Sequence, residues 1–425
     1  MKQIISAITI LILTMFCTPL FAADDDQDKK DTDLETNDIF SARSGYIHPF
    51  LSIGAKNSDN ITNTKDDTID DWSTIYSPGI WVTTTPKHDI FLNLNTSNTS
   101  PGGRFQEVDK QETFSRFQAY ALYAATIEEY SSHSERDTTK QAAEASLQAN
   151  LPGSLSFDVF GKYTDSEDPM GTGDSTEIEK YTNNLYGTIL QYDFTEKFSI
   201  RAEYSQFYLD YDLEISKGKN REDSSYGAYF FYNYSPKTSL FIQYENIAVS
   251  YETNTTQDSD QNYIYAGLKW RSAEKTSFKG KVGYIDRSSD NPLAPSKTGA
   301  VMEITVEHDF TAKTGIQFLA SHKLNESTIS TSAYSTDTTV QLSVNKNFTE
   351  KIDSILYLGY TRTDFEGNAG IGRSDDVFSI TPVFRYTFTK WLQAEAEFSH
   401  TERDSDVTAF DYKTNTFYLR LNAGL

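Results

Sequence analysis

The end of the chain constrains its fold most strongly, because apolar and polar residues alternate there without a break. One set of alternate positions is apolar: Phe417, Leu419, Leu421, Ala423 and Leu425. The positions between them hold Tyr418, Arg420, Asn422 and Gly424. Successive side chains of a β-strand point to opposite faces, so this period of two predicts a strand with one apolar and one polar face.

The same alternation recurs along the chain. Phe198, Ile200, Ala202 and Tyr204 alternate with Ser199, Arg201, Glu203 and Ser205. The 27 tyrosines and 27 phenylalanines argue against a disordered chain. The mean hydropathy of −0.55 indicates that half of each strand is polar. Apolar outer faces and polar inner faces are typical of a bacterial outer-membrane β-barrel. Leu425 stands where such barrels usually end in an aromatic residue.

A repeat in the second half of the chain indicates how the strands connect. An aromatic residue is followed by a short polar turn with a lysine, and a new alternating stretch begins. The aromatics are Phe194, Tyr234, Trp270, Phe310, Phe348 and Phe388, at spacings of 40, 36, 40, 38 and 40 residues. A solenoid or a propeller can have such a period. Each repeat holds one short turn and one longer polar loop, however, which favours pairs of barrel strands.

Counting from this repeat predicts an all-β, antiparallel transmembrane barrel of about 18 strands, with 16 or 20 strands as alternatives. We expect strands near residues 43–55, 73–85, 115–129, 138–150, 155–164, 179–194, 198–211, 222–234, 239–251, 260–270, 277–287, 298–310, 315–324, 336–348, 352–363, 374–388, 391–402 and 410–425. Residues 56–72 between the first two strands are polar and predict an exposed loop. An even number of strands places both termini in the periplasm.

Residues 86–114 do not fit this count. The stretch from His88 to Asn95 alternates like a strand, but Ser100-Pro101-Gly102-Gly103 interrupts it. A single strand here would make the number of strands odd. We therefore predict a periplasmic insertion or an inward-folded loop. Half of a hairpin with a second, unrecognised strand is the alternative, which would give 20 strands.

The first residues predict export to the bacterial outer membrane. Lys2, the apolar run from Ile4 to Phe16 and the small residues Ala22 and Ala23 have the pattern of a cleaved signal peptide over residues 1–23. Residues 24–42 are polar and acidic, and we expect a disordered periplasmic leader there. The barrel would then occupy residues 43–425. The one cysteine, Cys17, lies within the signal peptide, so we expect no disulfide in the mature chain.

Short segments near the start of the barrel resemble a known family. Pro49-Phe50-Leu51, Ser58-Asp59-Asn60-Ile61 and Tyr76-Ser77-Pro78-Gly79-Ile80 are similar to the N-terminal signature of the putative β-barrel porin 2 family. Proteins of this family are associated with exopolysaccharide loci. The resemblance implies a porin-like barrel with polysaccharide-related traffic, and polysaccharide export components as partners.

The charge of the chain limits its other partners. Without Lys2, 37 basic residues remain against 61 acidic ones, a formal charge of −24. Nucleic-acid binding needs clustered basic charge, so we expect no nucleic-acid partner. We expect contact with outer-membrane lipid and lipopolysaccharide, and assembly by the barrel assembly machinery.

The candidate functional residues are charges on the predicted lumen faces. They are Arg201, Glu203, Lys279, Lys281, Glu303, Glu307, Arg385, Glu395, Glu397 and Arg420. Opposite charges on neighbouring strands can pair and neutralise a wet wall, each pair contributing about 0.2–1 kcal/mol. In the second interpretation, unpaired members create a field across a pore and select solutes.

These observations favour a porin-like channel for exopolysaccharide export or solute passage, because a barrel of this size has a lumen wide enough for water and solute. A structural or adhesive barrel without an open pore is one alternative, and an outer-membrane enzyme is another. The six histidines are scattered, and neither a Gly-x-Ser-x-Gly motif nor a phosphate-binding glycine loop occurs. We therefore expect no catalytic residues, no metal ion and no cofactor.

Overall fold

The computed structural model describes residues 46–84, 94–104, 116–168, 177–272, 275–289, 296–327, 329, 332–367 and 372–424. The predicted signal peptide (1–23) and leader (24–42) lie outside these residues. Eighteen strands occur in the described part: β1 (Ile47–Ser58), β2 (Asp71–Thr83), β3 (Phe117–Tyr130), β4 (Thr138–Leu151), β5 (Leu155–Glu167), β6 (Lys180–Asp193), β7 (Phe198–Tyr211), β8 (Arg221–Ser235), β9 (Thr238–Tyr251), β10 (Ser259–Ser272), β11 (Thr276–Ser288), β12 (Lys297–Thr311), β13 (Thr314–Asn325), β14 (Ser332–Asn347), β15 (Ile352–Gly367), β16 (Arg373–Thr389), β17 (Leu392–Ser405) and β18 (Tyr412–Gly424).

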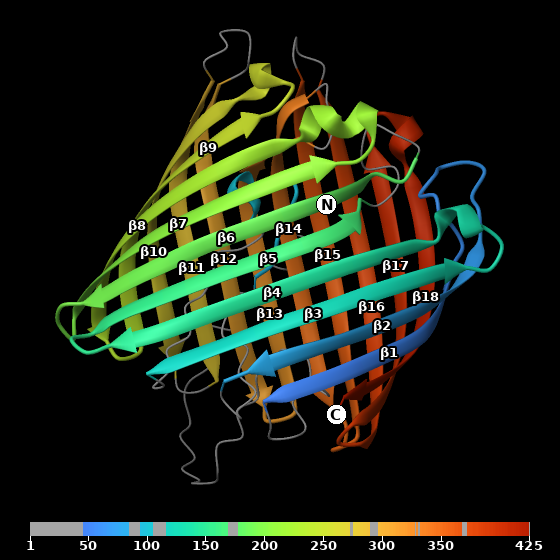
Figure 1. Ribbon diagram of the computed structural model, residues 1–425, viewed down its shortest axis with the longest axis horizontal. Helices are drawn as coiled ribbons and strands as arrows, with labels where there is room; N and C mark the ends of the chain where they lie inside the picture. The colour runs from blue at the N-terminus through green and yellow to red at the C-terminus, as the bar shows by residue number, and fades with distance from the viewer. Residues whose placement is uncertain are drawn as a thin grey trace. The chain divides into compact units, whose positions relative to one another are not determined.

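These strands form one closed antiparallel barrel, as predicted. Each strand pairs with its neighbour in the chain, and β1 pairs with β18 from Phe50 opposite Gly424 to Ser58 opposite Thr416. Figure 1 shows β1 and β18 side by side at this seam. Closure leaves no strand edge unpaired, which is the condition for strands to cross a lipid bilayer. The predicted number of 18 strands is confirmed.

The connections at the two rims of the barrel differ in length. We call the rim where β1 begins and β18 ends the terminal rim, and the opposite one the far rim. Seven connections at the terminal rim have two to four residues, and those at the far rim have five to twelve. The connection from β2 to β3, residues 84–116, also starts from the terminal rim and is much longer. That the terminal rim faces the periplasm stays a prediction.

Hydroxyl groups explain the repeated turn sequence at the terminal rim. Thr195 Oγ1 accepts hydrogen bonds from the backbone N–H of Lys197 at 3.2 Å and of Phe198 at 3.0 Å. Thr349 Oγ1 accepts the equivalent bonds from Lys351 and Ile352 at 3.2 and 3.0 Å. Such a bond from a hydroxyl two residues upstream stabilises a tight turn. The aromatics before five of these turns, Phe194, Tyr234, Phe310, Phe348 and Phe388, are exposed, as expected of an interface girdle.

Side chains of the strands alternate between the outer surface and the interior. In β7, Ile200 and Tyr204 are exposed on the outside, while Ser199, Arg201 and Ser205 are buried inside. In β18, Leu419 and Leu421 likewise face outward. The interior of a barrel normally holds polar groups and water, but this one also buries apolar clusters. Something inside the barrel must therefore cover them.

Several strands extend further toward the far rim than predicted. β1 reaches Ser58 rather than residue 55, β14 begins at Ser332 rather than 336, and β15 ends at Gly367 rather than 363. The added residues are largely polar, and pairing continues because the ladder uses backbone groups rather than side chains. The predicted exposed loop at 56–72 is accordingly shorter, and Asn60 within it is buried, donating to the backbone oxygen of Lys413 at 3.0 Å.

The helices in the described residues are short 3-10 helices of three to six residues. They are η2 (Pro101–Gly103), η3 (Ser134–Arg136), η4 (Glu214–Lys219), η5 (Thr255–Gln257) and η7 (Thr408–Phe410). None of the helices in the described ranges is long and apolar enough to cross a membrane.

Candidate functional site

Residues 94–104, here called the inward segment, lie inside the barrel. They belong to the connection between β2 and β3, and a backbone bridge joins Thr96 to Arg104. Gly102 and Gly103 have φ values of 71° and 70°. Glycine adopts this left-handed conformation without the steric penalty that a Cβ brings. The two glycines thus let the segment fold back on itself. The rest of the predicted insertion at 86–114 lies outside the described residues.

A cluster of apolar side chains on the barrel wall packs against the first part of the inward segment. Leu94 is 2% exposed and packs in a cluster with interior side chains of β5, β6 and β7. The wall residues of this cluster are Phe160, Leu185, Ile189, Phe207, Leu209 and Tyr211. Gly103 lies against the ring of Phe207, where an added Cβ would be 2.0 Å from a ring carbon. The inward segment therefore covers apolar side chains that the lumen would otherwise expose to water.

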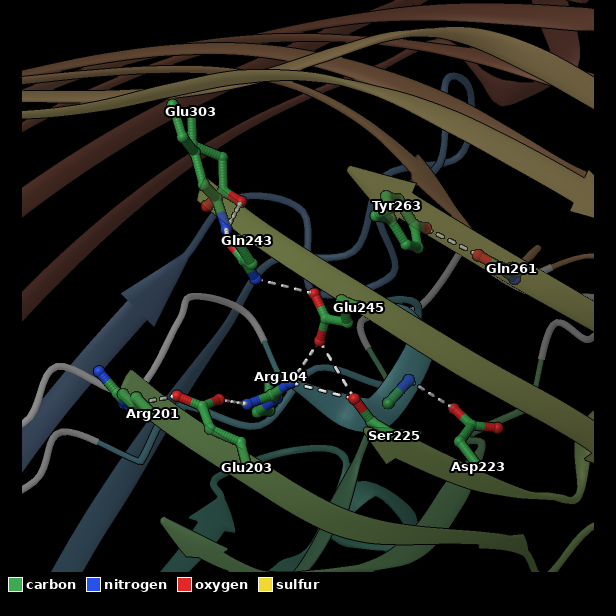
Figure 2. Close-up of polar contacts among 12 residues, drawn as sticks. Arg104, Arg201, Glu203, Asp223, Ser225, Gln243, Glu245, Gln261, Tyr263 and Glu303 are labelled. Carbon is green, nitrogen blue, oxygen red and sulfur yellow. Dashed lines mark hydrogen bonds and ion pairs between the residues drawn. The ribbon is translucent and has the colours of Figure 1, made fainter. Parts of the chain in front are cut away.

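Arg104 ties the inward segment to two strands by charge. Its Nη1 lies 3.2 Å from Glu203 Oε2 on β7, and its Nη2 lies 2.5 Å from Glu245 Oε1 on β9. Nη2 also donates to Ser225 Oγ on β8 at 3.2 Å. Figure 2 shows the Arg104 side chain among these partners. A buried guanidinium is stable only with such partners, so these three strands fix its position.

The tip of the inward segment is bound at the far rim. The backbone N–H of Gly102 donates to Asp223 Oδ2 at 2.9 Å, and Arg221 Nη2 donates to the backbone oxygen of Ser100 at 3.2 Å. Asn98 donates to Asp168 Oδ1 at 3.3 Å. Arg221 and Asp223 lie at the start of β8, so the segment reaches most of the way through the barrel from the terminal rim.

A residue from the far rim meets this tip. The backbone N–H of Glu326, directly after β13, donates to the backbone oxygen of Thr99 at 2.6 Å. The Glu326 carboxylate is fully buried and accepts hydrogen bonds from Tyr251 at 2.6 Å and Gln261 at 2.7 Å. The chain after β13 thus turns inward to the wall formed by β9 and β10. Elements from both rims meet inside the barrel.

The inward segment divides the interior into two unlike walls. We call the interior faces of β7–β10 the covered wall and those of β13–β18 the open wall. On the covered wall the side chains of Arg201 and Glu203 are 2% and 3% exposed. On the open wall Arg420 is 32% and Tyr357 44% exposed, and most mid-strand interior residues stay partly exposed. Solvent therefore reaches the open wall.

Charges on the open wall are paired in clusters. Arg385 Nε lies 2.9 Å from Glu395 Oε2, its Nη1 lies 3.8 Å from Asp353, and Arg420 also binds Glu395. On the neighbouring strands, Glu303 pairs with Lys281 at 3.1 Å and with Lys323 at 2.8 Å. The first cluster joins two arginines to two carboxylates, and the second joins two lysines to Glu303.

The predicted site residues lie on interior faces of the barrel, at different places. Arg201 and Glu203 form an ion pair at 2.6 Å on the covered wall. Lys279 lies opposite Thr305, and Glu307 accepts from Ser277 and Gln317 at 2.9 and 3.0 Å. The structure brings together Lys281 with Glu303, and Arg385 and Arg420 with Glu395. In the described part of the chain, the Glu397 carboxylate forms no hydrogen bond or ion pair. The role of these residues in solute selection stays a prediction.

Sequence reasoning missed the residues that fix the inward segment. Arg104, Asp223, Glu245 and Glu326 were not among the candidates, because their partners are distant in the chain and on non-neighbouring strands. The available signal was the Pro101-Gly102-Gly103 turn followed by an arginine, in a stretch too long for a terminal-rim turn. A charged residue beside such a turn needs a partner if the turn is buried.

Burial raises the pKa of Asp168, a far-rim residue just after β5. Tyr211 and Asn98 donate hydrogen bonds to its carboxylate and oppose that shift.

Among the residues that the structure describes, no group of three or more histidine, cysteine, aspartate or glutamate side chains has the geometry to hold a metal ion.

The comparison with family models gives one match. The model described as putative beta-barrel porin 2 covers residues 46–424, which is nearly all of the barrel. No curated protein matches the chain.

Solved structures with a similar chain trace include outer-membrane proteins of the Occ group. Acinetobacter baumannii OccAB4 is 10% identical, with a TM-score of 0.47 over 91% of this chain and 100% of its own. Pseudomonas aeruginosa OccK2 (OpdF) is 8% identical, with a TM-score of 0.46 over 90% and 99%. Pseudomonas aeruginosa OpdK with vanillate is 8% identical, with a TM-score of 0.44 over 90% and 100%. At these values the likenesses carry no conclusion about the function of this chain.

Proposed function

We propose that this chain, which belongs to the putative beta-barrel porin 2 family, is an outer-membrane channel that passes small polar solutes along its open wall. The observation that carries the proposal is the contrast between the two walls. The inward segment and its partners fill the space along β7–β10, while mid-strand side chains of β13–β18 keep contact with solvent. In this proposal the terminal rim faces the periplasm and the far rim faces the exterior.

The chemistry of the open wall supports passage of polar solutes. Hydroxyl and amide side chains dominate its middle: Thr339, Gln341, Ser343, Thr361, Ser379, Thr381, Ser399 and Thr416. These groups exchange hydrogen bonds with water or solute at little net cost, because each bond lost is replaced by another. The ion clusters of Glu303 and Glu395 flank this surface. A solute can therefore pass without losing its hydrogen bonds.

Export of an exopolysaccharide is the second candidate function. The hydroxyl-rich open wall and the exposed ring of Tyr357 favour it, since sugars bind through hydroxyl groups and through stacking on aromatic rings. The inward segment occupies part of the cross-section, which disfavours a bulky polymer. We therefore rank small polar solutes first and a single polysaccharide strand second.

Conductance and permeation test the proposed function. Purified full-length protein in a planar bilayer should give discrete conductance steps, and in liposomes it should admit glucose and disaccharides faster than dextran oligomers. A heat-dependent shift in gel mobility establishes that the same preparation is folded. Folded protein that conducts no ions, both intact and with residues 89–112 deleted, would exclude a passive channel and favour a structural or adhesive barrel. Equal permeation of long dextrans would favour the polysaccharide function.

A further inference from the structure

A cavity of about 660 Å³ lies at the far rim, on the side of the open wall. Its lining comes from the far-rim ends of β11–β16 and includes Lys297, Phe365, Glu366, Arg373 and Asp406. Sites for small molecules usually have about 300–1,000 Å³, so the cavity has the size of a solute site. A solute entering from the far rim would meet it early.

Arg373 provides a buried positive charge in this cavity. The residue is 8% exposed, and its guanidinium lies 4.5 Å from the ring centre of Phe365 and 4.0 Å from that of Phe410. Its Nη2 is 3.0 Å from Asp375 Oδ2, but neither Nε nor Nη2 makes a hydrogen bond with proper geometry to the described residues. Asp375 also binds Arg403, so one carboxylate serves two guanidinium groups. The two rings hold Arg373 rigid while some of its donors stay unused.

Lys297 provides a second cation whose charge is not neutralised. It is the first residue of β12 and half-buried in the cavity lining. Within the described ranges its ammonium group forms neither a hydrogen bond nor an ion pair. Lys323, in the same lining, is instead bound to Glu303 at 2.8 Å. Two lining cations, Arg373 and Lys297, therefore retain the capacity to bind an anionic group.

Two carboxylates of the same lining are also uncommitted. Glu366 near the end of β15 and Asp406 after β17 are exposed, and neither carboxylate has a hydrogen-bond or ion-pair partner among the residues described. Asp364 differs, because Arg362 lies 3.1 Å from its Oδ1 and Ser374 donates to it at 2.6 Å. The cavity thus offers two cations with unused donors, of which Arg373 is also paired with Asp375, and two carboxylates without a hydrogen-bond or ion-pair partner among the described residues.

We propose that this cavity binds a small zwitterionic solute, with the size and charges of an amino acid or a dipeptide. Arg373 takes its carboxylate, and Lys297, four strands away on β12, adds positive charge to the same cavity, while Glu366 and Asp406 attract its ammonium group. A simple anion would meet the two carboxylates, and a simple cation would meet the two basic groups, so only a solute with both charges satisfies both sets. The inference rests on the proposed function, because it names a class of solute for the same channel.

Binding to full-length protein in detergent micelles tests this inference without requiring conduction. The probes are glycylglycine, acetate, methylammonium and glucose, measured by titration calorimetry. We expect glycylglycine to bind most tightly. Lys297→Gln and Glu366→Gln, both at accessible positions, should each weaken glycylglycine binding about three- to fivefold, as expected for one partly exposed ion pair. Lys217→Gln and Glu214→Gln, which remove the same charges from η4 elsewhere on the far rim, should change nothing.

The outcomes separate this inference from the proposed function. The zwitterion site would be overturned if acetate or glucose bound as tightly as glycylglycine. It would also be overturned if Glu366→Gln left the affinity for glycylglycine unchanged. Absence of all binding in a protein that conducts ions would also overturn it and leave the channel standing. Selective glycylglycine binding by a protein that does not conduct would support the site and remove the proposed function.

Discussion

The covered wall and the open wall are built from the same kind of strand, yet their interior side chains have opposite surroundings. Those of the covered wall pack against the inward segment, and those of the open wall meet solvent. On the covered wall, Phe207 and Leu209 face inward at positions where the alternation would place polar groups in a water-filled barrel. They are stable there because Leu94 and Gly103 of the inward segment cover them. On the open wall, Thr381 and Ser399 face inward, hydrogen-bond each other at 2.9 Å and stay partly exposed. The polarity of an interior side chain thus indicates whether another part of the chain packs over it.

The charges of the two walls differ less than the apolar residues do, because Arg385 and Glu395 of the open wall are 10% and 4% exposed, much like Arg104 at 10%. Arg104 is enclosed by Glu203 and Glu245, and all three are nearly buried. Glu203 also pairs with Arg201, but within the described ranges Arg104 is the one cation that pairs with Glu245, so Glu245 depends on it. Arg420 keeps 32% exposure and shares Glu395 with Arg385, so either arginine still leaves the carboxylate compensated. Arg104 should therefore act mainly on stability, and the more exposed Arg420 mainly on ions and solutes in transit.

Replacement of Arg104 by glutamine should have the largest effect on stability. It leaves the nearly buried Glu245 without a cation, although Glu203 keeps Arg201, and breaking a buried ion pair in this way costs about 3–5 kcal/mol. The matched change on the open wall, Arg420→Gln, should cost at most about 1 kcal/mol. Urea unfolding in micelles, followed by tryptophan fluorescence, gives both values. Equal costs at the two positions would mean that the covered wall is not enclosed.

Gly103→Ala should come next, because two penalties add. The backbone has φ of 70°, and the new Cβ would lie 2.0 Å from the Phe207 ring. We expect a loss of roughly 2–4 kcal/mol from strain and overpacking together. Gly153, in the β4–β5 turn, has φ of 88° but no atom within 4 Å of an added Cβ. Gly153→Ala should therefore lose only about 1–2 kcal/mol. The difference between the two free energies of unfolding measures the contact of the inward segment with Phe207.

The strands could be predicted from the sequence because their signal is local. Alternation over ten or more residues predicts where a strand lies. The Phe-Thr-Glu-Lys turns, such as Phe194 to Lys197, predict where the chain reverses. Ion pairs between hairpin neighbours were predictable for the same reason, since Arg385 and Glu395 are ten residues apart on adjoining strands.

The inward segment could not be predicted in the same way because its contacts are distant in sequence. Arg104 and Glu245 are 141 residues apart, and no periodic pattern relates them. Only the mismatch of apolar residues on an inner face, such as Phe207 and Leu209 beyond Ser205, indicates that something covers this wall. Alternation predicts which face of a strand a residue occupies, but it does not predict what packs over that face.

Replacing Glu397 or Glu203 by glutamine should change a different measured property on each wall. Glu397 lies on the open wall, and removing its charge should lower the cation-to-anion permeability ratio, at most about fivefold from a charge interaction of about 1 kcal/mol in water. Glu203→Gln should leave that ratio unchanged and lower stability, because Glu203 binds Arg104 on the covered wall. Reversal potentials in a salt gradient measure the ratio. A change in the ratio for Glu203→Gln would place ions beside the covered wall.

The smallest effect should be a dependence of stability on pH at the tip of the inward segment. Burial raises the pKa of Asp168 above its ordinary value, so the folded protein holds this proton more tightly than the unfolded chain does. Stabilisation by protonated Asp168 is full below the ordinary aspartate pKa of about 3.9 and is lost as the pH rises through the raised folded value. Asp168→Asn should remove this contribution and flatten the stability profile in that window. Urea midpoints from pH 4 upward, compared for wild type and variant, measure it. A wild-type profile that rises more steeply than that of Asp168→Asn would contradict the raised pKa and, with it, the burial of the carboxylate beside Asn98.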